Sequence, residues 1–351
     1  MKYRSYGKGR SFLKYCRRYV TVAAGAAVVM GATAHAQWTR VALSGLDSVR
    51  FYGLVMSSPE SGLAVGFDGK GSKLYATKDG WASWTAMSVP GQYPFGIELP
   101  NSKAVLVGGR GTACKCATIS RTFDAGTTWI TDSLKPEGSK PLPGYSGIFA
   151  FSFADTKQGL AAGAGGVIAR TTDGGATWKM TSTGTVTRLF TDISFPVPER
   201  GYVIATDENN PNVPNLFYRS TDGGQSWQEV KSLPDGAGFS DIYFVSATTG
   251  FVAGADSAAA IYKTTDGGTT WKKVYSGQDG ISIDRLAFRN EKEGFASGLN
   301  GTMLHTTDGG RTWTAEQTGT DDRLAYVVVT GGTAYAIGQN GTLIKRALGK
   351  S

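Results

Sequence analysis

One motif, Ser/Thr-x-Asp-x-Gly-x-Ser/Thr-Trp, recurs six times in the 351-residue sequence and constrains the fold more than any other feature. Its aspartates stand 42–49 residues apart: Asp79, Asp124, Asp173, Asp222, Asp266 and Asp308. Its tryptophans are Trp84, Trp129, Trp178, Trp227, Trp271 and Trp313. An interval of this length holds four short strands, which is the size of one propeller blade. The spacing therefore predicts an all-β chain built from repeated blades.

A seventh unit follows from a second repeated element, a small-residue strand flanked by Gly. It occurs seven times, from Gly62–Gly66 to Ala334–Gly338, although only six Asp boxes exist. The last unit ends before its own Trp, whereas Trp38-Thr39-Arg40-Val41 matches the strand that begins at Trp271. We therefore expect residues 37–351 to form a single seven-bladed β-propeller, closed by an N-terminal strand that carries Trp38. Such closure leaves no open sheet edge.

The first 36 residues have the order of a secretory signal peptide. Residues 1–18 contain seven Lys and Arg and no acid, and an apolar run over 19–33 ends at Ala34-His35-Ala36. The run is shorter than the roughly 20 residues that a spanning helix needs. We expect cleavage after Ala36 and a periplasmic or lumenal location, with an uncleaved anchor as the alternative. Arg17-Arg18 leaves the choice between general and twin-Arg export open.

The charge of the chain lies mainly in this leader. The formal charge is +8, but residues 37–351 carry 29 Lys and Arg against 28 Asp and Glu. Such a balance gives no support to nucleic-acid binding. With two His in the chain, we expect no metal site and no cofactor. Cys114 and Cys116 either form a small disulfide or remain free thiols.

The Asp box is predicted to be a structural turn. Its carboxylate can accept backbone N–H bonds of the turn, its Gly allows a positive φ, and its Trp buries a large ring between sheets. Six equivalent aspartates cannot all be catalytic, although calcium or substrate binding at these turns is the alternative. Trp81 stands where the other boxes have Gly, which leaves it as the one Trp free to stack on a sugar.

The combination of Asp boxes, Gly-rich second strands and seven units resembles the photosystem II stability/assembly factor family of cyanobacteria and chloroplasts. The segment from Gly294 to Trp313 approximates the pattern Gly-x-x-Gly-x-Asn-Gly-Thr-φ-φ-x-Thr-Thr-Asp-Gly-Gly-x-Thr-Trp of that family. The resemblance spans residues 37–351 and implies a non-enzymatic lumenal or periplasmic protein that assists assembly of a membrane protein complex. Its partner would be a membrane protein or an exported peptide segment of one. Related proteins also occur in bacteria without photosynthesis, and the sequence does not separate the two cases.

Four arginines precede inner strands of the predicted ring: Arg50, Arg188, Arg285 and Arg323. We expect them to converge at the mouth of the central channel and to bind a carboxylate of the partner. The resemblance implies an Arg-rich binding patch in the same protein family. Alternatively, the nearby acids Asp47, Asp284 and Asp322 hold these arginines in local ion pairs.

A second set of basic residues precedes the Asp boxes on the opposite face: Arg121, Arg170, Arg219, Lys263, His305 and Lys345. We interpret this set as exposed strand ends that keep the protein soluble. Two insertions, 134–145 and 207–214, enlarge loops on the face of the first arginines and provide either recognition or neutral variation.

Two other functions remain open. A sialidase-like glycoside hydrolase would need two opposed carboxylates. The candidates are Asp47, Asp192, Asp241, Asp284 and Asp322. A propeller that binds carbohydrate without catalysis is the other alternative, with a glycan as its partner.

Overall fold

The computed structural model describes residues 38–114, 116–134, 147–181, 188–207, 215–234 and 237–349. The chain divides into two units, Met1–His35 and Ala36–Ser351, and all that follows concerns the second. The predicted signal peptide and most of both insertions lie outside the described residues. No helix long and apolar enough to cross a membrane occurs among the described residues.

The described chain forms seven antiparallel sheets of four strands each, as the repeat predicts. Blade 1 comprises β2 (Arg50–Met56), β3 (Gly62–Phe67), β4 (Ser72–Thr77) and β5 (Thr85–Met87). Blade 2 comprises β6 (Gln92–Glu98), β7 (Val105–Gly111), β8 (Ala117–Thr122) and β9 (Ile130–Leu134). Blade 3 comprises β10 (Ile148–Phe153), β11 (Gly159–Gly163), β12 (Ile168–Thr171) and β13 (Lys179–Thr181).

The remaining blades repeat this order. Blade 4 comprises β14 (Arg188–Val197), β15 (Arg200–Asp207), β16 (Leu216–Ser220) and β17 (Gln228–Val230). Blade 5 comprises β18 (Gly238–Phe244), β19 (Gly250–Ala255), β20 (Ala258–Thr264) and β21 (Lys272–Asp279). Blade 6 comprises β22 (Ile283–Phe288), β23 (Gly294–Gly298), β24 (Met303–Thr306) and β25 (Thr314–Ala315). Blade 7 comprises β26 (Tyr326–Thr330), β27 (Thr333–Ile337), β28 (Leu343–Ala347) and β1 (Thr39–Arg40).

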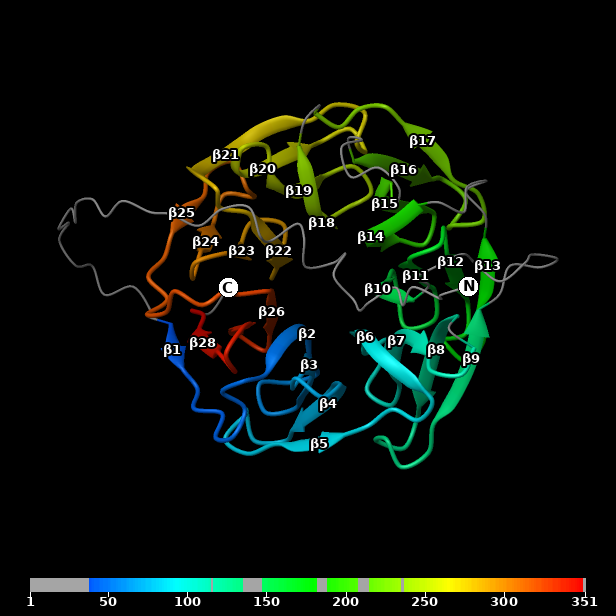
Figure 1. Ribbon diagram of the computed structural model, residues 1–351. Coiled ribbons are helices and arrows are strands. Elements are labelled where there is room, and N and C mark those ends of the chain that lie inside the picture. The colour runs from blue at the N-terminus through cyan, green and yellow to red at the C-terminus, as the bar shows by residue number, and fades with distance from the viewer. Residues whose placement is uncertain are drawn as a thin grey trace, which may run out of the picture. The chain divides into compact units, whose positions relative to one another are not determined.

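Blade 7 confirms the predicted closure of the ring. Its strand order is β1-β28-β27-β26, and Thr39 pairs with Lys345 in an antiparallel register. The outer strand of the last blade is therefore supplied by the N-terminal end of the domain. Figure 1 shows the blades arranged around a common axis, with β2, β6, β10, β14, β18, β22 and β26 innermost.

The core lies between neighbouring blades, because both faces of each sheet are covered. Buried aliphatic and aromatic side chains of adjacent sheets form continuous clusters. The Asp-box tryptophans contribute to these contacts. Trp271, for example, packs edge-on against Phe217 of blade 4 and Phe244 of blade 5. Each blade thus contributes one large ring to the seam beside it, which holds the ring of sheets together.

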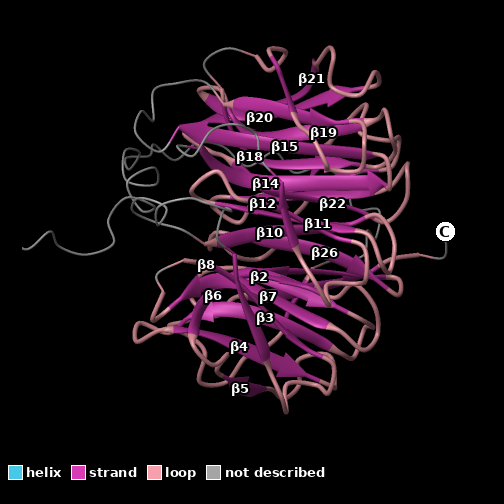
Figure 2. Ribbon diagram, turned by 90° about the vertical axis from the view of Figure 1, so that its right-hand side faces the viewer, coloured by secondary structure: helices cyan, strands magenta, loops and turns pink. Residues whose placement is uncertain are grey.

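The direction of the strands defines two faces. In Figure 2 the inner strand β14 points to the right, so the inner strands start on the left. We call the face where inner strands start the mouth face; it also carries the turns between second and third strands. The opposite face carries the Asp boxes and the turns between first and second strands, and we call it the Asp-box face. The Gly80 N–H donates to the Glu60 carbonyl at 2.8 Å, which joins two such turns of blade 1.

Candidate functional site

A β-bulge near the start of the inner strand fixes equivalent positions around the ring. The register shifts between Phe51 and Gly53 in blade 1, and between Ile283 and Arg285 in blade 6. In blade 7 the Leu324 N–H donates to the Gly298 carbonyl of blade 6, as the Phe51 N–H donates to the Gly338 carbonyl of blade 7. Phe51, Ile283 and Leu324 are therefore equivalent.

This register corrects the predicted alignment of the four arginines. Arg50 and Arg323 both stand directly before the equivalent buried residue. Arg188 stands one position earlier, because Phe190 precedes the bulge of blade 4. Arg285 stands three positions later, beyond the bulge of its own strand. The triplet Asp-Arg-Leu occurs at both Arg285 and Arg323, but Arg323 precedes the equivalent buried residue Leu324 whereas Arg285 follows its counterpart Ile283.

Arg285 forms an internal ion-pair triad with two carboxylates of the preceding blades. Its Nη1 lies 2.5 Å from Asp241 Oδ1 and 3.0 Å from Asp192 Oδ1. Its guanidinium also stacks over the ring of Tyr326, 4.4 Å from the ring centroid. All three charged side chains are largely buried. Burial, together with the neighbouring Asp192, raises the pKa of Asp241 well above its ordinary value.

The two aspartates of this triad also accept hydrogen bonds from backbone N–H groups of the next inner strand. Asp192 Oδ2 accepts the Ile242 N–H of the next blade at 3.1 Å, and Asp241 Oδ2 accepts the Leu286 N–H at 2.8 Å. An inner strand has no neighbour on its channel side, so these N–H groups need side-chain partners. Asp192 and Asp241, two of the five aspartates considered above as catalytic candidates for a glycoside hydrolase, thus connect blades 4, 5 and 6.

Arg323 is paired in the same manner, across a blade boundary. Its Nε and Nη2 donate to the two oxygens of Asp284 at 2.6 and 3.1 Å, a bidentate arrangement. The predicted local partner, Asp322, instead accepts bonds from Thr320, Asn340 and Thr342. The ion pairs expected from neighbouring positions in the sequence are therefore replaced by pairs between blades. About 31 % of the Arg323 side chain remains accessible.

Arg50 differs from these two residues. It is exposed at the start of β2, and within the described residues its guanidinium forms no hydrogen bond or ion pair. Its register partner Phe67 is 41 % exposed, which is unusual for a large ring. Tyr93, the equivalent of Arg50 in blade 2, is 51 % exposed. Blades 7, 1 and 2 are consecutive in the ring, so Arg323, Arg50, Phe67 and Tyr93 lie on the mouth face of neighbouring blades. We call these four residues the mouth patch.

The sequence does not reveal the aromatic half of this patch. Phe67 and Tyr93 lie near strand ends, where an aromatic residue in the sequence is normally interpreted as part of the core. Only the tertiary structure shows that both side chains are exposed. Arg188, the fourth predicted arginine, opens β14, but its side chain is outside the described residues. Its place in a binding surface stays a prediction.

The channel contains a further acid that the sequence analysis did not single out. Glu98, at the end of β6, accepts the N–H of Leu99 at 2.8 Å. Burial raises the pKa of Glu98 to about 7. Tyr243 and Tyr326 lie within electrostatic range of it, and burial raises the pKa of both phenols. The channel wall is therefore populated by groups whose charged forms are disfavoured by desolvation.

The Asp-box carboxylates are occupied by their own turns. Asp266 Oδ1 accepts the N–H groups of Thr269 and Thr270, both at 2.9 Å, while Oδ2 accepts the Thr270 hydroxyl. The Thr264 hydroxyl completes the turn. The Thr270 hydroxyl and N–H hold the pKa of Asp266 at about 2. The other five boxes show the same bonds from the Ser or Thr that precedes the Trp.

Trp81 does not occupy the surface position that the sequence suggested for it. Its side chain is fully buried, among Tyr335, Leu343 and other core residues of blades 7 and 1. Its backbone adopts a φ of 71°, the left-handed conformation for which the other boxes use Gly. The spare Trp is therefore not available for stacking on a sugar.

Five of the six residues in the second basic set have partners rather than only the solubilising role that we expected. The side chains of Arg170, Arg219 and Lys263 donate to the carbonyls of Gly223, Gly267 and Gly309 in the Asp box of the next blade, at 2.7, 3.4 and 2.7 Å. Arg121 pairs with Asp132 and His305 lies between Glu293 and Glu316. These residues connect blades or strands, because a single cation at each seam can satisfy a carbonyl of the neighbouring turn.

Cys114 and Cys116 form a disulfide in the turn between β7 and β8. Among the described residues, no group of three or more His, Cys, Asp or Glu side chains is placed to hold a metal ion. The seven blades, the Asp-box turns and the seam contacts together define an Asp-box β-propeller.

Comparison with known families makes the assignment more specific. The profile of the family described as photosynthesis system II assembly factor YCF48 matches residues 139–273 and 273–347. These segments cover more than half of the chain, and the chain belongs to this family. No curated protein sequence matches at a significant level.

Solved structures support the fold. The structure of YCF48 bound to D1 peptide shares 16 % identity, with a TM-score of 0.68, over 91 % of this chain and 97 % of its own. YCF48 from Cyanidioschyzon merolae shares 19 % identity, with a TM-score of 0.66, over 89 % and 99 %. The GH74 xyloglucanase from Xanthomonas campestris shares 19 % identity, with a TM-score of 0.64, over 90 % of this chain and 54 % of its own. At such identities these likenesses concern the fold alone.

Proposed function

We propose that this protein is an exported, non-enzymatic assembly factor whose mouth patch binds a peptide segment of a membrane protein. The family assignment and the relative that is described as bound to D1 peptide support a peptide partner. The predicted signal peptide supports export.

The observation that carries the proposal is the exposed Arg50 beside the exposed ring of Phe67. An unpaired guanidinium can bind a carboxylate in a bidentate manner, and exposed aromatic rings can bury apolar side chains of the same peptide. Tyr93 extends this surface onto blade 2. The partner is therefore a segment that combines a carboxylate, such as a C-terminus, with apolar residues.

The other arginines contribute less to this binding. Arg285 is enclosed by Asp192 and Asp241, and a ligand would have to displace both. Arg323 is engaged by Asp284 but keeps an accessible edge, so it can orient a carboxylate that Arg50 holds. We therefore assign the main role to Arg50 and a supporting role to Arg323.

The alternative functions have weaker support in this structure. Asp192, Asp241 and Asp284 are occupied by arginines, and Trp81 is buried. The GH74 xyloglucanase shares the propeller fold, which hosts many functions. We therefore propose neither hydrolysis nor glycan binding for this chain.

The first test compares capture of membrane proteins from detergent-solubilised membranes. The mature protein, an Arg50→Glu/Phe67→Ala variant and a Lys272→Glu control would be immobilised. Lys272 is exposed on the outer strand β21, so the control changes charge equally and lies away from the mouth. A membrane protein retained by the wild type and the control, and lost by the double variant, is expected. Equal capture by all three proteins would contradict the proposed site.

The second test uses peptides from the captured protein, with a free or amidated C-terminus. We expect the free carboxylate to bind about tenfold more tightly or better, because a charge-assisted hydrogen bond contributes about 1.5–3 kcal/mol. Arg50→Gln should remove this difference. The export part is tested separately, by N-terminal sequencing of the protein from the periplasmic or lumenal fraction; a mature chain that begins at Gln37 is expected.

A further inference from the structure

Grooves between blades on the Asp-box face offer a surface that is separate from the mouth patch. The third strand of one blade forms one wall of each groove. The Asp box and the first-to-second-strand turn of the next blade form the other wall. The groove between blades 5 and 6 has a volume of about 480 Å³, and the groove between blades 7 and 1 about 340 Å³. Because the blades are repeats, the residues at equivalent positions of different grooves can be compared directly.

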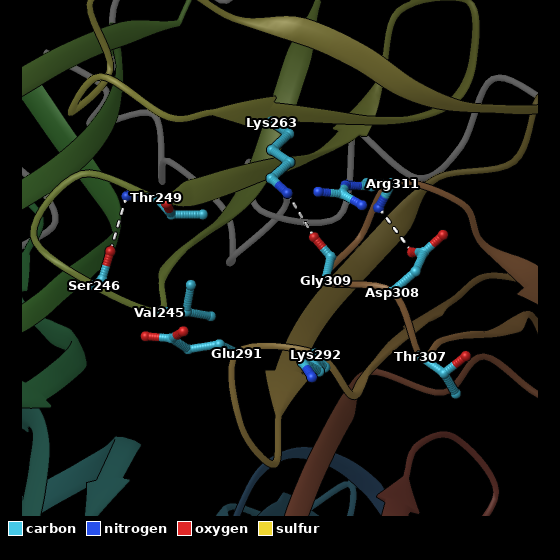
Figure 3. Close-up of a pocket in the computed structure, with 10 residues that line it drawn as sticks. All are labelled: Val245, Ser246, Thr249, Lys263, Glu291, Lys292, Thr307, Asp308, Gly309 and Arg311. Carbon is cyan, nitrogen blue, oxygen red and sulfur yellow. Dashed lines mark hydrogen bonds between the residues drawn. The ribbon is translucent and has the colours of Figure 1, made fainter.

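The groove between blades 5 and 6 combines three cations from three different elements. Lys263 comes from β20, Lys292 from the turn between β22 and β23, and Arg311 from the Asp box of blade 6. Figure 3 shows the side chains of Lys263 and Arg311 approaching each other above Gly309. We call this set the cation groove.

No other Asp box has a basic residue at the position of Arg311, although Lys157 of blade 3 occupies the position of Lys292. The carbonyls of Glu60, Thr248 and Lys292 accept the N–H of the Asp-box Gly in blades 1, 5 and 6, which makes these three residues equivalent. The groove between blades 7 and 1 accordingly has Lys345, Glu60 and Ala82, and that between blades 4 and 5 has Arg219, Thr248 and Thr269. The fold therefore does not require Lys292 or Arg311.

The three cations outnumber the two acids that line the cation groove, Asp308 and Glu291. Asp308 accepts four hydrogen bonds from its own turn, from the Thr306 and Thr312 hydroxyls and the Arg311 and Thr312 N–H groups. These donors are neutral, and the negative charge of Asp308 still acts on Lys263. Glu291 forms no ion pair with the three cations among the described residues, and Figure 3 shows its carboxylate directed away from Lys263 and Arg311. Lys263 and Arg311 thus lie beside the same groove, where the charge of Asp308 offsets their positive charge only in part.

The hydrogen bond and the pKa of Lys263 describe the position and the electrostatic environment of this cation. Its Nζ donates to the Gly309 carbonyl at 2.7 Å, which fixes the ammonium at the groove. Burial lowers the pKa of Lys263, the neighbouring Arg311 lowers it further, and Asp308 opposes the two effects without cancelling them. An anion between them would remove this repulsion and would find a planar guanidinium fork together with point charges.

We propose that the cation groove binds a small ligand that carries an oxyanion, either a carboxylate or a phosphate group. Arg311 would bind the anion through its guanidinium, and Lys263 and Lys292 would flank it. The hydroxyl of Thr307 lies on the same wall and can donate to a second oxygen. This site is on the opposite face from the mouth patch, so it does not depend on the proposed peptide binding.

Isothermal titration of the full mature protein with inorganic phosphate and with succinate tests the proposal. Variants Lys292→Thr and Arg311→Thr introduce the residues that blade 5 already has at these positions, so they should fold normally. Lys345→Thr, in the groove between blades 7 and 1, is the matched control. We expect saturable binding of at least one anion with a Kd near or below about 1 mM. Each groove variant should weaken it by about tenfold or more, whereas the control should leave it unchanged.

The two probes distinguish the sources of the anion. Binding of phosphate alone assigns phosphate esters to the groove, and binding of succinate alone assigns carboxylates. Absence of saturable binding for both probes would overturn the proposal. Binding that Lys292→Thr and Arg311→Thr leave unchanged would also overturn it. Loss of mouth-patch binding in the same protein preparations would not affect either conclusion, because the faces are separate.

Discussion

The indole Nε1 of Trp38 donates a hydrogen bond to Glu316 Oε2 at 2.7 Å, although the two residues stand at opposite ends of the propeller chain. Glu316 also accepts a bond from Arg346 of β28 and lies 3.0 Å from His305 Nδ1. The Trp38 ring packs edge-on against Phe295 of blade 6. One carboxylate thus connects the outer strand of blade 7 to blade 6 and to the last strand of the chain.

Trp38→Ala should therefore destabilise the whole ring. The side chain is only 4 % exposed, and removal of a buried Trp costs about 3–5 kcal/mol. We expect a fall in the melting temperature of roughly 10 °C, measured by scanning calorimetry. Thr39→Ala, which alters an exposed position of the same strand, serves as the control. An unchanged melting temperature would mean that the closure strand contributes little to stability.

Arg285→Met tests whether the ion-pair triad is structural. The change leaves Asp192 and Asp241 buried without their guanidinium, and loss of one partner of a buried pair costs about 3–5 kcal/mol. Urea unfolding should show this loss. Arg285→Met combined with Asp241→Asn should recover part of the stability, because one carboxylate is neutralised while its side chain can still pack. If the double variant is as unstable as the single one, charge is not the cause.

Glu98 predicts an unusual dependence of stability on pH. Burial raises its pKa from 4.5 to about 7, so the folded protein keeps a proton that the unfolded chain releases. The contribution of Glu98 is therefore fully present below pH 4.5 and is lost as the pH rises through 7. We expect the free energy of unfolding to fall between pH 5 and pH 8 by more in the wild type than in the Glu98→Gln variant. Parallel pH profiles of the two proteins would contradict a raised pKa of Glu98 in the folded protein.

Trp81→Gly tests whether the Trp that replaces Gly in the first Asp box stabilises the protein. The change restores the residue of the other Asp boxes and relieves the positive φ of 71°, which costs about 1–3 kcal/mol for a residue with a side chain. It also removes a fully buried ring, at a cost of about 3–5 kcal/mol. We expect a net loss of about 2 kcal/mol by urea unfolding. A gain in stability would show that strain outweighs packing at this turn.

Much of the architecture was predictable because it depends on local chemistry that recurs. The Asp-box turn needs a hydrogen-bond acceptor, a positive φ and a large ring within eight residues. The motif meets these requirements with Asp, Gly and Trp, respectively. The match between the segments that begin at Trp38 and Trp271 predicted β1 in the last blade. A repeat of fixed length with a missing strand at one end leaves few topologies that bury every sheet face.

The candidate site was less predictable, since it depends on register and on contacts between blades. Four arginines were predicted to be equivalent, but the register places Arg285 after the equivalent buried residue of its strand and Arg50 before it. The partners of Arg285 and Arg323 come from other blades, about 40–90 residues away in the sequence. Neither the spacing of residues nor the composition identifies these ion-pair partners, because ion pairing depends on the distance between charged groups in the folded protein.

The sequence by itself determined the number of blades, the role of the Asp boxes and the strand that closes the ring. Local turn chemistry and the alternation of strands suffice for these features. Only the tertiary structure decided which cations are neutralised and which remain exposed. Arg285 is enclosed between two carboxylates, whereas Arg50 faces solvent beside Phe67. The free energy of a charge depends on the groups that the fold brings within a few ångströms of it, and this environment forms only when the blades pack together.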